Sequence, residues 1–310
     1  MNILYFLEPS IEFGNPLFRY NSLKNSILPQ VKSLLEFNNI ATLVSEPIAN
    51  KAVEDNIHEQ LGHLCVVDPF LWMNGEEYNK RALRLLKGEI SAQELKMLKK
   101  ILLEALPPNF EPDLIICWES PAPFLEKIFK NSQIINQIPG FFSRAPYPFF
   151  ISMNRGLLDK YVPALSQRNY TSEEYKSLSE YREYERHFLN TTFPLHKITD
   201  SLRKKYKKLI LIPLQIDNYF MVDTTLGKKN QFELLHDILN NIPKDYALIV
   251  TNYISKDIQS GVLSPEGAAY LKRIFPNFIY DIRFNGLYCA SQFLVPIVDG
   301  IITISSSVGL

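Results

Sequence analysis

Polar side chains follow two apolar runs in the C-terminal third of the chain, where such runs would leave a sheet. KLILIPL is followed by Gln215 and then by Asp217, and YALIVT is followed by Asn252. A carboxylate at the end of a buried strand can act as a base, a nucleophile or a ribose ligand. An ordinary turn explains such residues equally well. Taken alone, each of these strand ends therefore leaves a purely structural role open.

A third apolar run, DGIITI, leads into Ser305, Ser306, Ser307 and, two residues on, Gly309. Small hydroxyl residues and a glycine after a strand can present O–H and N–H groups to a phosphate. The segment has neither the GK[ST] of a Walker loop nor the GxGxxG dinucleotide fingerprint. We interpret these four residues as candidate nucleotide-binding residues.

Two further candidates lie in the N-terminal half. Glu119 follows the apolar run DLIICW, and Arg144 lies in the aromatic and proline-rich stretch PGFFSRAPYP. Glu119 could be a general base for an acceptor hydroxyl, or an acid placed at the start of a helix. Arg144 could contact an anionic sugar, or hold its own loop by an ion pair. We expect this loop, within Pro139–Pro163, to be ordered and to lie near a cleft.

Other chemistries have no support in the residue spacing. The five histidines form no HExxH pattern, and Cys65, Cys117 and Cys289 lie in separate apolar stretches. There is also no GxSxG nucleophile elbow. We therefore expect no bound metal, no cofactor and no serine hydrolase activity.

Charge and hydropathy bear on partners and location. Lys and Arg total 33, and Asp and Glu total 33, so a broad nucleic-acid surface is not expected. No apolar run reaches the roughly 18 residues of a membrane-spanning helix, and the N-terminus does not resemble a signal peptide. We expect a cytoplasmic protein. The basic cluster between Arg203 and Lys208 leaves open a peripheral association with the inner face of the cytoplasmic membrane, besides its role as a solvated helix end.

Strand-like and helix-like segments alternate along the whole chain, which predicts an α/β fold with parallel, doubly wound sheets. The predicted strands are Ile3–Leu7, Ile40–Val44, Leu64–Val67, Asp113–Trp118, Ile134–Ile138, Lys208–Leu214, Tyr246–Thr251, Phe278–Tyr280 and Asp299–Ile304. The predicted helices are Asn21–Phe37, Glu76–Lys87, Ala92–Leu106, Pro121–Phe129, Thr171–Asn190, Gln231–Asn241, Pro265–Phe275 and Leu287–Val295.

A chain of 310 residues is long enough for two domains. We place an N-terminal, acceptor-type lobe over residues 1–195 and a C-terminal, nucleotide-sugar-binding lobe over residues 196–310. The sequence stops where a helix should follow the last strand, and an open parallel sheet needs its crossover helices. We therefore expect that the C-terminal lobe is truncated.

Together, the segments PLQID (213–217), TN (251–252) and TISSSVG (303–309) resemble the capsular polysaccharide synthesis family. This family includes β-Kdo transferases that use CMP-Kdo. The resemblance covers roughly Lys208–Leu310, and the PGFFSRAPYP stretch is similar, less specifically, to the acceptor lobe of Kdo-transferase-like proteins. Thr251-Asn252 stands where the family usually has a His-Pro segment, and the spacing from Gln215 to Asp217 is shorter than the family's.

The resemblance implies a GT-B-like fold of two Rossmann-like lobes and a retaining transfer of an acidic sugar, Kdo or a related nonulosonate, from a CMP donor to a glycan or glycolipid acceptor. It implies that Asp217 is the carboxylate nucleophile. Gln215, Asn252, Ser305, Ser306, Ser307 and Gly309 would bind the donor, Glu119 would assist catalysis, and Arg144 would contact the acceptor or sugar. Two alternatives stay open: a UDP- or GDP-hexose transferase, and a non-catalytic lobe of a capsule assembly complex.

Overall fold

A computed structural model describes residues 1–10, 16–119, 122–139, 151–154, 169, 171–192, 195–215, 230–252, 262–286 and 290–303. The chain divides into two compact units, Met1–Arg168 and Asn169–Leu310, which we describe separately. Helix α10 (Ser172–Thr192), which the sequence analysis assigned to the first lobe, therefore groups with the second unit.

The first unit is built on a six-stranded sheet with the strand order β3-β2-β1-β4-β5-β6. Neighbouring strands pair in parallel from β3 to β5, and only the β5–β6 pair is antiparallel. The strands are β1 (Asn2–Phe6), β2 (Asn39–Ser45), β3 (His63–Val67), β4 (Leu114–Trp118), β5 (Gln133–Pro139) and β6 (Ile151–Asn154). The order reverses between β1 and β4, which makes the ends of these two strands the topological switch point of the sheet.

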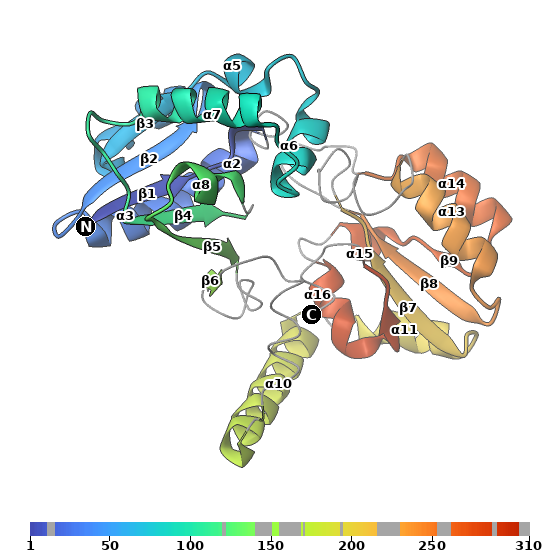
Figure 1. The fold of residues 1–310 in the computed structure, drawn as a ribbon. Helices are drawn as coiled ribbons and strands as arrows, with labels where there is room; N and C mark the ends of the chain where they lie inside the picture. The colour runs from blue at the N-terminus through green and yellow to red at the C-terminus, as the bar shows by residue number, and fades with distance from the viewer. Residues whose placement is uncertain are drawn as a thin grey trace. The chain divides into compact units, whose positions relative to one another are not determined.

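Helices cover both faces of this sheet, as parallel strands require. One face packs against α2 (Pro16–Ser22), the turn Leu23–Ile27, α3 (Leu28–Leu34), α4 (Glu46–Glu54) and the 3₁₀ turn His58–Leu61. The other packs against α5 (Pro69–Met73), α6 (Tyr78–Leu86), α7 (Ala92–Ala105) and α8 (Phe124–Ile128), and Figure 1 shows α7 lying across that face. Buried aliphatic and aromatic side chains thus form two cores, one on each side of the sheet.

The second unit has a four-stranded parallel sheet in the order β10-β7-β8-β9. The strands are β7 (Lys208–Pro213), β8 (Tyr246–Thr251), β9 (Phe278–Ile279) and β10 (Gly300–Ile301). Helices α13 (Gln231–Asn241) and α14 (Pro265–Ile274) pack on one face. The other face packs against α11 (His196–Arg203), α15 (Ile282–Asn285), α16 (Ala290–Leu294) and the 3₁₀ turn Val295–Ile297.

The predicted α/β class is confirmed: the chain forms two Rossmann-like lobes, each built on a parallel or mostly parallel sheet. Each predicted strand and helix has a counterpart in the same region of the chain, with ends that differ by a few residues. No helix among the described residues is long and apolar enough to cross a membrane.

The first predicted helix differs most from its counterpart. Instead of one helix from Asn21 to Phe37, the chain is helical from Pro16 to Leu34 and passes through a π-helical turn at Leu23–Ile27. Pro29 lies just after this turn and has no N–H to donate to the preceding turn. The wider turn accommodates the proline without ending the helix.

Gly62 joins the 3₁₀ turn to β3 and offers a test of the packing around β2. Its φ is +70°, and a Cβ at this position would overlap the carbonyl oxygen of Ile40 in β2. We predict that Gly62→Ala lowers the free energy of unfolding by about 3 kcal/mol or more, because left-handed strain and a clash with backbone add.

Gly75→Ala is the matched control. Gly75 has a φ of +75°, but no atom lies within 4 Å of the place that a Cβ would take there, so only the strain of about 1–2 kcal/mol should be lost. Urea unfolding measures both variants. Equal losses would show that the contact with Ile40 does not limit this position.

Candidate functional site

The three strand exits singled out in the sequence lie side by side in the second unit. β7 pairs with β10 on one side and with β8 on the other, all in parallel. Pro213 is paired with Thr251, and Ile301 is paired with Leu211. The segments that follow β7, β8 and β10 therefore leave the sheet at one edge, where ligands of open α/β sheets bind.

Gln215 follows β7 at this edge and is held through its backbone. Its N–H donates to Oε1 of Gln231 at 2.7 Å, and its carbonyl accepts a hydrogen bond from Nε2 of the same side chain. Gln231 is buried at the first turn of α13, and Asn230 caps that helix by accepting a hydrogen bond from the N–H of Glu233. The start of α13 thus fixes the chain at Gln215.

Asn252 follows β8 and is bonded through every polar atom of its amide. Its Nδ2 donates to the Leu263 carbonyl at 3.1 Å and to the Tyr280 hydroxyl at 2.9 Å. Its Oδ1 accepts from the N–H groups of Val262 at 2.8 Å and of Leu263 at 3.1 Å, and its own N–H donates to Oδ1 of Asn285. The side chain predicted to bind the donor therefore fixes the segment leading into α14.

The remaining candidates cannot be placed. Asp217, Arg144, Ser305, Ser306, Ser307 and Gly309 lie outside the residues that the structure describes. The described residues bring together only Gln215 and Asn252 of the predicted donor-binding set. Glu119, predicted as a catalytic residue, lies in the other unit.

In the first unit, two carboxylates lie at the switch point. Phe6 of β1 is paired with Cys117 of β4, and Glu8 and Glu119 each follow two residues later. Glu119 leaves β4 with a φ of +59°, a conformation that costs a residue with a Cβ about 1–2 kcal/mol. Its N–H donates to the Gln137 carbonyl on β5 at 2.7 Å, which secures the turn.

Glu119 forms a buried ion pair with Arg19 of α2. Nη1 of Arg19 lies 2.6 Å from Oε2 of Glu119, and the two side chains are 2% and 11% exposed. Burial raises the pKa of Glu119 above its usual range, and the positive charge of Arg19 opposes this rise. Within the described part of the chain, Nη2 of Arg19 has no hydrogen-bond partner.

Glu8 is held by the opposite helical layer. Its Oε1 accepts hydrogen bonds from Nε1 of Trp72 in α5 and from the hydroxyl of Ser10, each at 2.7 Å. Glu8 and Ser10 are buried with 3% and 0% exposure, and Trp72 packs against Phe6 and Phe124. Each of the two switch-point carboxylates is thus fixed by a different layer of the unit.

A carboxylate with a raised pKa is a better proton acceptor at neutral pH than an ordinary glutamate. Arg19 bonds one oxygen of Glu119, and no described residue donates a hydrogen bond to the other, Oε1. The arrangement can therefore take a proton from a hydroxyl placed beside Oε1. Among the described residues, no group of three or more His, Cys, Asp or Glu side chains could hold a metal ion.

Sequence reasoning found Glu119 but missed Arg19 and Glu8. Glu8 follows the first strand, so the switch-point rule applied to that strand would have found it. No local pattern marks Arg19, because its partner lies 100 residues further along the chain.

No protein-family model matches the chain. No curated protein matches it either. Among solved structures, it is similar to a putative UDP-N-acetylglucosamine 2-epimerase from Listeria monocytogenes, with 12% identity, 99% of this chain and 74% of the other covered, and a TM-score of 0.30.

Two further structures are similar at the same level. For the calicheamicin glycosyltransferase CalG4, identity is 10%, coverage is 99% of this chain and 75% of the other, and the TM-score is 0.33. For the UDP-GlcNAc 2-epimerase from Neisseria meningitidis, the values are 11%, 98% and 78%, and 0.28. At these scores the likenesses carry no argument about activity.

The buried pair can be tested by its response to pH. We predict that Arg19→Met lowers the free energy of unfolding by about 3–5 kcal/mol at neutral pH, because it leaves a charged Glu119 buried alone. The pKa of Glu119 in the folded variant should rise further, since Arg19 no longer lowers it. Because the variant takes up this proton in the folded state, its deficit should shrink as the pH falls through that raised pKa.

Removing both charges in Arg19→Met/Glu119→Gln should restore most of the lost stability. The control is Lys24→Met, which breaks the solvent-exposed ion pair between Lys24 and Asp55. This change should lower the free energy of unfolding by no more than about 1 kcal/mol. Denaturant unfolding between acid and neutral pH gives all the values. A deficit in Arg19→Met that is the same at every pH would contradict a charged Glu119.

Proposed function

We propose that the chain is a glycosyltransferase that moves an acidic sugar, Kdo or a related nonulosonate, from a CMP donor to a bacterial surface glycan. The observation that carries the proposal is the strand order of the second unit. It places the exits of β7, β8 and β10 at neighbouring positions of one sheet edge. The three segments that carry the resemblance, PLQID, TN and TISSSVG, begin at or just after the ends of these strands.

The donor would bind at this edge. The CMP phosphate would accept hydrogen bonds from the O–H and N–H groups of Ser305, Ser306, Ser307 and Gly309. These bonds would stabilise the phosphate as it leaves. Gln215 and Asn252 would contact the donor from the turns that follow β7 and β8. Fixed donors of this kind can serve without a metal ion.

Transfer would proceed in two steps with retention of configuration. Asp217 attacks the anomeric carbon, the bond from that carbon to the CMP oxygen breaks, and a glycosyl ester forms. An acceptor hydroxyl then displaces Asp217 and gives its proton to a base. Glu119 has the raised pKa that such a base needs, and Arg144 would contact the acidic sugar.

The first prediction of this proposal concerns the nucleotide. We expect CMP to stabilise the folded protein, by about 2.7 kcal/mol at a concentration 100-fold above its Kd. Thermal unfolding with CMP, UDP and GDP in parallel measures the preference. Stabilisation by UDP or GDP alone would favour a hexose transferase, and stabilisation by none of the three would favour a non-catalytic lobe.

The second prediction concerns Asp217. We expect Asp217→Asn to leave the unfolding temperature unchanged and to abolish sugar transfer, because an amide is a far weaker nucleophile than a carboxylate. Asp200→Asn, at an exposed position of α11, is the control and should be silent. If Asp217 is only a turn residue, asparagine serves equally well, so transfer at the unaltered rate would remove it from the catalytic role.

A further inference from the structure

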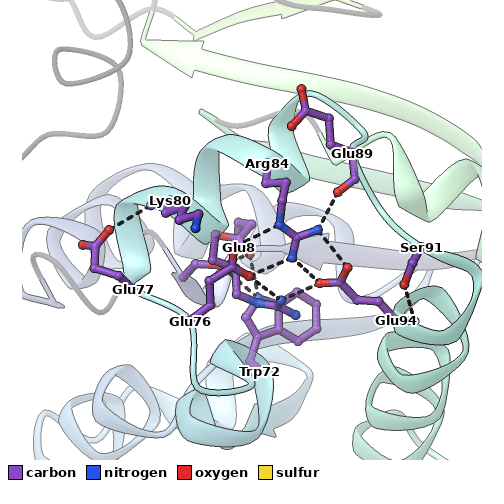
Figure 2. A network of polar contacts seen from close by, with 11 residues as sticks. Glu8, Trp72, Glu76, Glu77, Lys80, Arg84, Glu89, Ser91 and Glu94 are labelled. Carbon is purple, nitrogen blue, oxygen red and sulfur yellow. Dashed lines mark hydrogen bonds and ion pairs between the residues drawn. The ribbon is translucent and has the colours of Figure 1, made fainter. Parts of the chain in front are cut away.

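A second polar cluster of the first unit involves neither Arg19 nor Glu119. Its members are Arg81 and Arg84 of α6, Glu94 of α7, and Glu76, which precedes α6. Figure 2 shows the Arg84 guanidinium between the carboxylates of Glu76 and Glu94. Its Nη2 lies 2.7 Å from Glu76 and 2.5 Å from Glu94, its Nε bonds Glu76 at 3.0 Å, and its Nη1 bonds Glu94 at 2.8 Å.

The charges in this cluster balance. The hydrogen bonds from Arg84 hold the pKa values of Glu76 and Glu94 below their usual range, so both are ionised at neutral pH. Two positive and two negative side chains then share one network, and a ligand beside it meets no net charge. Arg81 is fully buried and bonds Glu94 through Nη1 at 2.5 Å, whereas its Nε and Nη2 have no partner among the described residues.

A cavity of about 420 Å³ opens beside the cluster. It is lined by Arg84 and Glu94 from the cluster, by Asn74, Ser91 and Gln93, and by Met97. This volume lies within the range of about 300–1,000 Å³ that is typical of small-molecule sites. Glu94 is held by ion pairs with Arg81 and Arg84, so its carboxylate is fixed beside the cavity.

The lining selects for a ligand that both donates and accepts hydrogen bonds. Glu94 can only accept, whereas the amides of Asn74 and Gln93 both donate and accept. The N–H groups of Arg84 are already bonded to Glu76, to Glu94 and to the carbonyl of Glu89. An anion would lie against the carboxylate of Glu94, and a cation against Arg84. A neutral sugar avoids both penalties, because its hydroxyls can donate to Glu94 and accept from the amides of Asn74 and Gln93, and its C–H face can contact Met97.

We propose that this cavity is a binding subsite for a neutral sugar residue of the acceptor glycan. The inference rests on the proposed function, to which it adds the chemical class of the acceptor. In this arrangement the Arg–Glu cluster orients hydroxyl groups and takes no part in the chemistry. The first unit would thus hold the acceptor through a subsite on α6 and α7.

The experiment is saturation-transfer NMR on the full chain, with lactose, maltose and chitobiose as neutral probes and with inorganic phosphate and glucuronate as anionic probes. We expect at least one disaccharide to bind with a millimolar Kd, and neither anion to compete with it. Gln93→Ala should weaken binding about five-fold, as expected for one lost hydrogen bond. Gln93→Trp should abolish binding by filling the cavity.

Gln93 is exposed at the first turn of α7, so both variants should fold, and their unfolding temperatures check this. Lys99→Ala, on the same helix but outside the lining, is the control and should leave the Kd unchanged. Failure of all three disaccharides to bind, competition by phosphate or glucuronate, or unchanged binding to Gln93→Trp would each overturn the subsite. Stabilisation by CMP alongside such a failure would leave the proposed function standing, whereas sugar binding without any nucleotide effect would remove the transferase and keep the site.

Discussion

Parallel pairing brings the ends of neighbouring strands, and the polar residues that follow them, to one edge of the sheet in each unit. Neighbouring strands that run in the same direction must end together, and the helices that return the chain cover both faces. Apart from β6, every described strand of both units obeys this constraint. Residues far apart in the sequence, such as Gln215 and Asn252, therefore leave neighbouring strands of the same sheet.

The switch point of the first unit carries an energetic cost at Glu119. Glu119 adopts a left-handed conformation, and its carboxylate is buried. Burying a charge costs several kcal/mol unless a partner offsets it, and Arg19 is that partner. One guanidinium nitrogen of Arg19 bonds Glu119 and its Nη2 lacks a described partner, as do Nε and Nη2 of Arg81, whereas all three nitrogens of Arg84 are bonded.

The sequence predicts those features that depend on neighbouring residues, and it misses those that depend on distant contacts. Helix α13 has the predicted bounds, Gln231–Asn241, because its apolar spacing and its cap are local signals. Local signals also found Glu119, as the polar residue that ends a buried strand, although they could not tell a helix-starting acid from a buried ion pair. Arg19 is an isolated cation in the sequence, and only the packing of α2 on the sheet brings it to Glu119. The full burial of Arg81 likewise follows from the packing of α6 against the core, which periodicity alone does not reveal.

Asn252 ties three elements of the second unit together. A proline at this position would have no N–H to donate. In this chain the N–H of Asn252 donates to Asn285, and its amide holds Val262, Leu263 and Tyr280. One side chain thereby ties the end of β8 to the start of α14 and to the end of β9. Hydrogen bonds of a single asparagine thus fix the turn at this edge of the sheet.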